Sequence, residues 1–405
     1  MMTLIVAHKH RNLLYQYRKQ GVVKLQKFIV ITCCAIGLAS CGNRPSALVS
    51  EPQPGKSGRT FADWCLARAN LIPEAKHTVE LLLQKAGTTE CDAANQKLLS
   101  LTVLDLGRNE ISDIKRISDI KPLASLINLT KLDLGRNAIS DIKPLASLIN
   151  LTELDLSLNP IDDIKSLKSL TNLTSLLLSY NGIDDLKALE SLTKLTELDL
   201  TDNGINDIKP LQFLTKLKYV KLSGNQISDI KPLKSLTNLT YLELSGNKVN
   251  DIKPLKSLTN LTWLSLDRNP IDDIKPLASL TKLTGLSLYQ NQISDIKPLQ
   301  SMTNLTWLSL NSNQISDIKP LQSMTNLITL SLNNNQISDI KPLQSMTKLI
   351  TLSISDNQIR DVKPLQSMTK LTELSLVRNP IVLKNCPVKP KSLCQWEAPK
   401  EEYQP

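Results

Sequence analysis

Aromatic residues are scarce in this chain of 405 residues, where Phe, Trp and Tyr together make up 3%. Hydrophobic residues nevertheless account for 41% of the chain, so Leu and Ile must fill most of the interior. A large core built almost without aromatic rings predicts one small packing unit that repeats many times.

Residues that carry catalytic chemistry are also few. Beyond residue 41 there is a single histidine, His77, in a segment with a helical pattern where a surface or packing role is expected. The sequence has no Gly-rich phosphate loop, HExxH motif or nucleophile motif, and no cysteine spacing typical of zinc. We therefore expect neither an enzyme nor a site for a metal or cofactor.

The formal net charge of +10 comes mostly from the start of the chain. Residues 1–41 contain six Lys and Arg and no acid, which leaves 42 basic and 38 acidic residues, or +4, in the remainder. So small an excess does not indicate binding to the phosphate backbone of a nucleic acid.

Residues 28–43 carry no charge and follow Lys24 and Lys27. A hydrophobic run of about 13 residues is shorter than the roughly 20 that span a bilayer, which indicates a signal peptide. The run ends in LASC, residues 38–41, which resembles the lipobox of bacterial lipoproteins. That resemblance implies a signal peptide over residues 1–40, lipidation of Cys41 and membrane anchoring in the cell envelope outside the cytoplasm. Gly42 is compatible with the outer membrane or cell surface, and an ordinary cleaved signal is the alternative.

From Leu101 onward the chain repeats with a period of 22 residues, up to residue 381. Thirteen copies begin at Leu101, Leu129, Leu151, Leu173, Leu195, Leu217, Leu239, Leu261, Leu283, Leu305, Leu327, Leu349 and Leu371, and that Leu is position 1 of each copy. The first copy is longer by six residues, because SDIK occurs in it twice. Repetition on this scale predicts a solenoid.

The pattern L-x-x-L-x-L-x-x-N-x-I resembles the leucine-rich repeat, and its continuation x-D-I-x-P-L resembles the 22-residue subtype of bacterial internalins and phosphatase regulators. The resemblance implies an α/β solenoid, a curved horseshoe with a parallel sheet on its concave side and 3-10 turns on its convex side. The residues agree, since Leu at positions 4 and 6 alternates with outward positions 3, 5 and 7. We expect the Asn at position 9 to satisfy backbone groups, and the Asp at position 13, from Asp113 to Asp361, to cap the convex turn.

The segments on either side of the repeats have other roles. Residues 41–59 are rich in Pro, Gly and Ser and predict a flexible linker. Residues 60–100 predict a helical N-terminal cap with helices over 60–69, 73–86 and 90–98, and capping-box spacing occurs at Thr60 and again at Thr89. Residues 382–405 form the expected C-terminal cap and tail.

Four cysteines remain beyond Cys41, and they fall into two pairs at opposite ends of the repeats. We expect the disulfides Cys65–Cys91 and Cys386–Cys394, which suit an oxidising compartment. Four reduced thiols, or a metal site, are the alternatives.

The few aromatic residues gather on one surface. Six of the fourteen occupy outward positions 3, 7 and 8 of the repeats: Tyr180, Tyr219, Tyr241, Trp263, Tyr289 and Trp307. Position 5 carries acids in the early copies, including Asp155, Asp199 and Glu243, and Ser in the last six. Grouped aromatic side chains with polar neighbours are typical of binding hot spots, although neighbouring rings can also simply stabilise a sheet.

These features together predict an exported, lipid-anchored and monomeric binding protein. Its concave face would bind a protein ligand, as internalins do, through those aromatic residues, while Asp155, Asp199 and Glu243 attract a basic part of the ligand. A glycan ligand is one alternative. The others are an intracellular scaffold that resembles the phosphatase regulators, and a purely structural component of the envelope.

Overall fold

The structure, a computed structural model, describes residues 58–107 and 116–396, all within one compact unit, Ser57–Pro405. The expected signal peptide, the lipidation site Cys41 and the C-terminal tail beyond residue 396 lie outside the described residues. So do Asn109 and Asp113 of the first repeat. Among the described residues, no helix is both long and apolar enough to cross a membrane.

Three α-helices and a short 3-10 helix precede the repeats: α2 (Phe61–Leu66), η2 (Arg68–Asn70), α3 (Pro73–Ala86) and α4 (Cys91–Ser100). The Thr60 side chain and Asp63 form the expected capping box at the start of α2. Thr89 forms no such box, because the N-cap of α4 is Glu90, whose side chain makes no capping bond. The first expected helix is shorter than its pattern, since α2 ends at Leu66 and a 3-10 turn follows.

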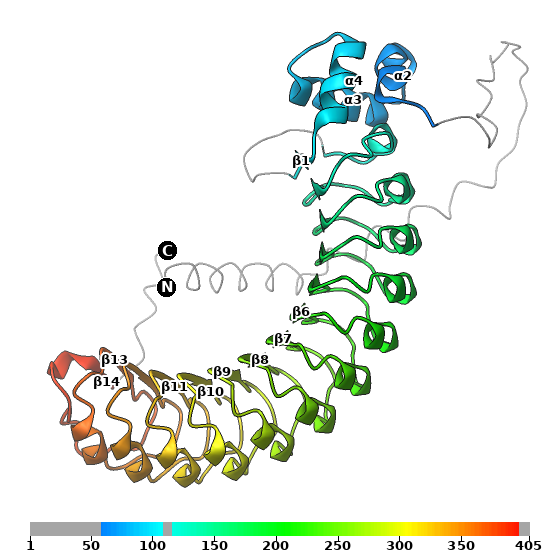
Figure 1. The fold of residues 1–405 in the computed structure, drawn as a ribbon. Helices are drawn as coiled ribbons and strands as arrows, with labels where there is room; N and C mark the ends of the chain where they lie inside the picture. Colours follow the sequence, from blue (N-terminus) through cyan, green and yellow to red (C-terminus); the bar gives the residue numbers. More distant parts are fainter. Residues whose placement is uncertain (1–57, 108–115, 397–405) are drawn as a thin grey trace, which may run out of the picture. The chain divides into compact units, whose positions relative to one another are not determined.

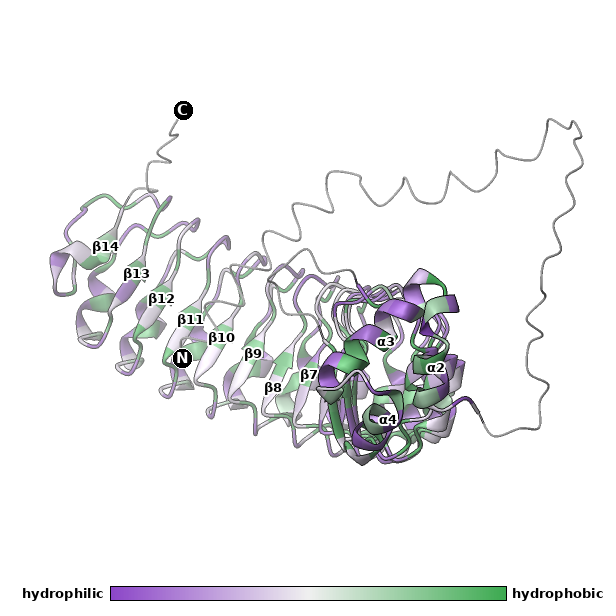
Figure 2. Ribbon diagram, turned by 90° about the horizontal axis from the view of Figure 1, so that it is seen from above, coloured by the Kyte–Doolittle hydropathy of each residue, from purple (hydrophilic) through white to green (hydrophobic). Residues whose placement is uncertain are grey.

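The helices are tied to one another and to the first repeat. A disulfide joins Cys65 in α2 to Cys91 at the start of α4. The buried Thr78 of α3 donates a hydrogen bond of 2.6 Å to the backbone oxygen of Asp119 in the first repeat. Figure 1 shows these helices at the start of the repeat array, and in Figure 2, seen from above, they lie in front of the first repeats. Their buried apolar side chains belong to the same core as those of the repeats, so the helices cap this end of the array.

Each repeat contributes one short strand at positions 3 to 5, and the strands pair in parallel and in chain order. They are β1 (Val103–Asp105), β2 (Lys131–Asp133), β3 (Glu153–Asp155), β4 (Ser175–Leu177), β5 (Glu197–Asp199), β6 (Tyr219–Lys221), β7 (Tyr241–Glu243), β8 (Trp263–Ser265), β9 (Gly285–Ser287), β10 (Trp307–Ser309), β11 (Thr329–Ser331), β12 (Thr351–Ser353) and β13 (Glu373–Ser375). The repeats follow an arc with these strands on its inner side (Figure 1), so the expected solenoid is confirmed.

In the first twelve repeats, the side of the coil opposite the strand is a 3-10 helix, which lies on the outer side of the arc (Figure 1). These helices are η3 (Lys121–Leu123), η4 (Lys143–Ser147), η5 (Lys165–Ser169), η6 (Lys187–Ser191), η7 (Lys209–Phe213), η8 (Lys231–Ser235), η9 (Lys253–Ser257), η10 (Lys275–Ser279), η11 (Lys297–Ser301), η12 (Lys319–Ser323), η13 (Lys341–Ser345) and η14 (Lys363–Ser367). Before each helix, the position 13 Asp accepts a hydrogen bond from the backbone N–H two residues on, as Asp229 does from Lys231 at 2.9 Å. The side chain thus fixes the turn that starts the helix.

The first repeat uses its second SDIK segment. Asp119 accepts from the backbone N–H of Lys121, and the backbone N–H of Ile117 donates to Asn137 in the next repeat. Asp119 therefore caps the convex turn of this repeat, and the expectation for Asp113 lies outside the described residues. Counting positions from Leu101 pointed to the first SDIK segment, because the count does not allow for the six extra residues of this repeat.

After the last repeat, the chain returns to the sheet. The 3-10 helix η15 (Lys391–Leu393) leads into β14 (Cys394–Gln395), which pairs in parallel with β13. A disulfide joins Cys386 to Cys394, and Trp396 packs against the end of the core.

The position 9 Asn links each coil to the coil before it. In Asn225, Oδ1 accepts from the backbone N–H of Ile205 at 3.1 Å, and Nδ2 donates to the backbone oxygens of Leu200 and Leu222 at 2.9 and 3.0 Å. The side chain is buried, with 7% of its surface exposed. One amide therefore satisfies three backbone groups that have little access to water.

We expect Asn225→Ala to lower the free energy of unfolding by about 3 kcal/mol, because it leaves buried backbone groups unpaired. Asn238→Ala is the matched control, since Asn238 also bonds a backbone oxygen of the previous repeat but is exposed. Its cost should stay below about 1 kcal/mol. Guanidinium unfolding followed by circular dichroism measures both, and equal losses would contradict the role of the buried column.

Candidate functional site

Four aromatic side chains from position 3 form a continuous stack on the inner face of the sheet, here named the aromatic ladder: Tyr219, Tyr241, Trp263 and Trp307. They lie in one register on β6, β7, β8 and β10, and all four are partly exposed. The ring centroids of Tyr219 and Tyr241 are 4.1 Å apart, those of Tyr241 and Trp263 are 6.1 Å apart, and those of Trp263 and Trp307 are 5.1 Å apart.

The ladder crosses a strand that contributes no side chain to it. Gly285 in β9 pairs with Trp263 on one side and Trp307 on the other. A Cβ atom at residue 285 would lie 2.2 Å from Cε3 of Trp263, so the indole lies over the glycine. The absence of a side chain at residue 285 is what brings the two indoles together.

Charged side chains hold the first two rings. The Tyr241 hydroxyl donates a hydrogen bond to Oε1 of Glu243, and burial and then Glu243 raise the pKa of Tyr241 above its ordinary value. Nζ of Lys221 lies 5.3 Å from the centre of the Tyr219 ring and 3.9 Å from Oδ2 of Asp199. Burial lowers the pKa of Lys221, but Tyr219, Asp199 and Glu243 together raise it above its ordinary value. At neutral pH the phenol is therefore neutral and the ammonium charged.

Three carboxylates form an acidic patch on the inner face of the first repeats: Asp105, Asp133 and Asp155. They lie in register on β1, β2 and β3, and beside them Lys131 pairs with Glu153 at 2.6 Å. Burial raises the pKa of Asp133; the Gly135 N–H lowers it, and repulsion from Asp155 and Asp105 raises it again, so the pKa lies above its ordinary value. Carboxylates stacked in this way attract a cationic group.

The remaining predicted residues lie outside the ladder. Tyr289 is at position 7, where its backbone N–H donates to Asp267 and its ring faces the Arg268 guanidinium at 5.5 Å. Tyr180 follows β4, so β5 separates it from the first ring of the ladder. It adopts a φ of 58° and is 38% exposed. Asp199 and Glu243 flank the ladder, whereas Asp155 belongs to the acidic patch.

Sequence reasoning missed Lys221 and Gly285. Lys221 is the one cation at position 5 of the thirteen repeats, and Gly285 is the one glycine at position 3. Each departure from its column is a sequence signal that could have identified the residue. The alternation of the strand also predicted that the position 5 serines are exposed to solvent, but Ser265, Ser287 and Ser309 are buried. They stand beside the large position 3 indoles, which accounts for their low exposure.

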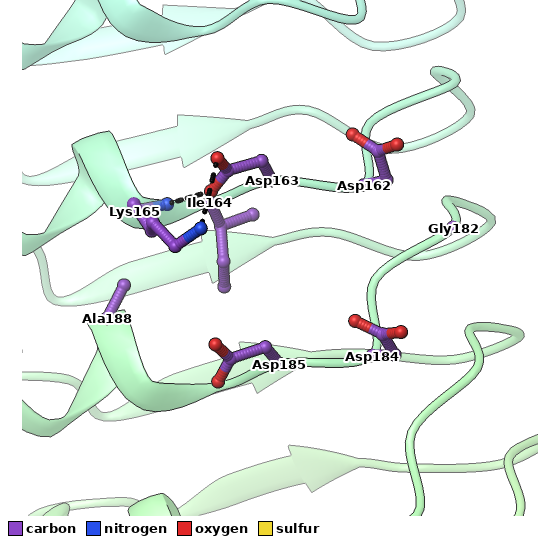
Figure 3. A pocket seen from close by; sticks show the side chains of 8 residues that line it. All are labelled: Asp162, Asp163, Ile164, Lys165, Gly182, Asp184, Asp185 and Ala188. Carbon is purple, nitrogen blue, oxygen red and sulfur yellow. Dashed lines mark hydrogen bonds and ion pairs between the residues drawn. The ribbon is translucent and has the colours of Figure 1, made fainter.

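A depression lies between the third and fourth repeats, away from the ladder. Figure 3 shows its lining of Asp162, Asp163, Ile164, Lys165, Gly182, Asp184, Asp185 and Ala188. Two of its carboxylates are already used, since Asp163 and Asp185 accept from the backbone N–H groups of Lys165 and Lys187 at the starts of η5 and η6. Among the described residues no group of His, Cys, Asp and Glu could hold a metal ion. We therefore regard this depression as part of the repeat geometry.

The chain is similar to known proteins over its repeats. A family model described as leucine-rich repeats (2 copies) matches residues 99–147, 127–169, 171–213, 215–257, 259–301, 303–345 and 347–385. An internalin, inlF from Listeria monocytogenes, is 34% identical, and the match covers 78% of this chain and 92% of that one with a TM-score of 0.73. The comparison with curated proteins gives no match.

Two further structures share the fold. The functional domain of InlJ from Listeria monocytogenes is 22% identical over 80% of this chain and 77% of that one, with a TM-score of 0.57. The ectodomain of a plant membrane receptor kinase from Arabidopsis thaliana, in complex with CASPARIAN STRIP INTEGRITY FACTOR 2, is 24% identical. That match covers 65% of this chain and 37% of the receptor, with a TM-score of 0.54.

We expect Asp133→Asn to stabilise the protein at pH 7. The pKa of Asp133 is higher in the folded protein than in the unfolded chain. Asp133 therefore stabilises the fold at pH values below its unfolded pKa, and this contribution is lost as the pH rises through its folded pKa. The amide removes the charge and still accepts from the Gly135 N–H, as Oδ1 of Asp133 does at 2.8 Å.

The midpoint of guanidinium unfolding at pH 7 and at pH 3 tests this expectation. The midpoint of the variant should lie above that of the wild type at pH 7, and the difference should shrink at pH 3. A lower midpoint at pH 7 would show that the carboxylate is stabilising, contrary to the argument.

Proposed function

Since this chain belongs to the leucine-rich-repeat family and, within it, to the internalins, we propose that it binds a protein ligand on the inner face of its sheet. Proteins of this kind are typically binding proteins or receptors rather than enzymes. The fold alone does not select a ligand, so the proposal rests on the side chains that this chain places on the face.

The aromatic ladder is the observation that supports the proposal most strongly. The core of the repeats is filled by Leu, Ile, Met and Val, and it needs none of the four rings. The rings remain partly exposed and are bordered by polar side chains, which is the arrangement of a binding hot spot. Truncation of such a side chain typically costs about 2 kcal/mol of binding energy or more.

Charge on the same face has two roles in this proposal. The acidic patch of Asp105, Asp133 and Asp155 attracts a basic part of the ligand, which raises the association rate and makes it depend on salt. Asp199 and Glu243 act mainly at the ladder, because Asp199 pairs with Lys221 and Glu243 accepts from Tyr241.

We expect a variant with Tyr219, Tyr241, Trp263 and Trp307 all changed to Ser to lose its ligand, with an affinity at least about 30-fold lower, equivalent to about 2 kcal/mol. The matched control changes Lys131, Glu153, Thr329 and Thr351 to Ser, because these side chains occupy the same column beyond the ladder. Capture from envelope extracts, followed by titration of the captured protein, measures both variants of the full chain. A partner bound equally by all three proteins would contradict the proposal.

Export and lipid anchoring form the second part of the proposal. They are supported by the LASC segment that ends at Cys41 and by the disulfides Cys65–Cys91 and Cys386–Cys394, which belong to oxidising compartments. The linker would separate an anchored Cys41 from the cap, and the protein would act as a monomer in the cell envelope. The two disulfides favour this location over the intracellular alternative.

We expect Cys41→Ser to abolish incorporation of a labelled fatty acid and to release the protein from the membrane fraction. Cys34→Ser, which changes a neighbouring cysteine of the signal peptide, is the control and should leave labelling unchanged. Incorporation of the fatty acid into the Cys41→Ser variant at the level of the control would contradict the lipoprotein assignment.

A further inference from the structure

One strand that the aromatic ladder crosses, β9, has no aromatic side chain at position 3. Along the position 3 column the order is Tyr219, Tyr241, Trp263, Gly285 and Trp307, so a glycine stands where a fourth consecutive ring would complete the series. Neighbouring strands of a sheet lie about 4.8 Å apart, so the backbones of Trp263 and Trp307, two strands apart, are separated by about 9.6 Å. That separation leaves one ring-sized place above Gly285.

In this structure the indole of Trp263 fills the place itself. A Cβ atom at residue 285 would lie 2.2 and 2.3 Å from Cε3 and Cζ3 of Trp263. The indole leans toward Trp307, with a centroid distance of 5.1 Å and an angle of 31° between the two ring planes. It lies farther from Tyr241, since their centroids are 6.1 Å apart while those of the two tyrosines are 4.1 Å apart.

The leaning position leaves one polar group unsatisfied. Nε1 of Trp263 is shielded from solvent and has no hydrogen-bond partner among the described residues. A buried donor without an acceptor disfavours the position that contains it. Packing against Gly285 and Trp307 holds the ring there, and rotation about the side-chain bonds of Trp263 to another staggered rotamer would move it off Gly285.

We propose that the place above Gly285 is a slot for an aromatic side chain of the ligand. The guest enters when the indole of Trp263 rotates off Gly285 and stands upright above its own strand, β8. This inference rests on the proposed function and adds the chemical group that the face recognises. A guest ring midway between upright indoles would lie about 4.8 Å from each, within the separations at which aromatic rings stack. The guest would complete a ladder of five rings.

The floor of the slot favours an uncharged ring. Position 5 beside it carries Ser265, Ser287 and Ser309, which are buried and bear no charge. The nearest carboxylates already accept hydrogen bonds: Glu243 at position 5 accepts from Tyr241, and Asp267 at position 7 accepts from the Ser265 hydroxyl and the backbone N–H of Tyr289. A guanidinium or ammonium group in the slot would have to compete for these carboxylates, whereas a phenyl, phenol or indole needs none.

Free indole is the probe for the slot, with methyl glucoside as the sugar probe and isobutanol as the aliphatic probe. Nuclear magnetic resonance of the nitrogen-labelled full chain follows two signals, the Gly285 amide and the Trp263 Nε1–H. Indole should shift both signals saturably, and isobutanol and methyl glucoside should not.

Gly285→Leu fills the slot with a branched side chain and should weaken the binding of indole at least 10-fold. Residue 285 has no left-handed backbone angle, so the backbone accepts a side chain there, but the new Cβ would lie 2.2 Å from Cε3 of Trp263 and the indole must move off residue 285 to make room. Thr329→Leu, a change to the same side chain in the same column on β11, is the control and should bind indole as the wild type does.

Three results would overturn the slot: the absence of saturable shifts with indole, equal shifts in the Gly285→Leu variant, or saturation by methyl glucoside in place of indole. The last result would assign the slot to a sugar. None of them bears on whether the four-residue ladder variant loses a captured protein, so failure of the slot is distinguishable from failure of the proposed function.

Discussion

The hydrogen bonds of the position 9 asparagines are the constraint on which the rest of this structure depends. Asn225 joins the backbone N–H of Ile205 and the backbone oxygen of Leu200 in one repeat to the oxygen of Leu222 in its own. Equivalent bonds recur in the following repeats, for example at Asn247 and Asn313. Because each coil is fixed to the coil before it, side chains at the same position of successive repeats stack in columns. The ladder and the acidic patch are two such columns.

Columns make a binding surface from very few residues. An isolated Tyr on a single strand is a small apolar spot, but the same residue in successive repeats gives a stack of ring faces about one strand spacing apart. The rings then stabilise one another, as Tyr219 and Tyr241 do, and still expose part of their surface. Stacking within the sheet and binding of a ligand are therefore compatible uses of the same side chains.

The repeat period and the alternation of Leu with polar residues were enough to predict the sheet, its inner face and the column that carries the rings. Details that depend on contact between columns could not be read from a pattern. Nothing in the sequence indicates that Trp263 leans over Gly285, or that Glu243 accepts from Tyr241, because both contacts are set by side-chain rotation within the folded sheet. In the first repeat the count from Leu101 pointed to Asp113, and the part that Asp119 plays in the turn became visible only from its bond to the Lys121 N–H.

The account's central claim is that the ligand covers the aromatic ladder. Hydroxyl-radical footprinting of the protein with and without its captured ligand tests it most directly, because aromatic side chains are among the groups that hydroxyl radicals oxidise fastest. Phe213 provides an internal reference, since it lies on η7 on the outer side of the arc and is 49% exposed. The account predicts that oxidation of Tyr219, Tyr241, Trp263 and Trp307 falls on binding while oxidation of Phe213 is unchanged. Protection of Phe213 with no change at the ladder would contradict it.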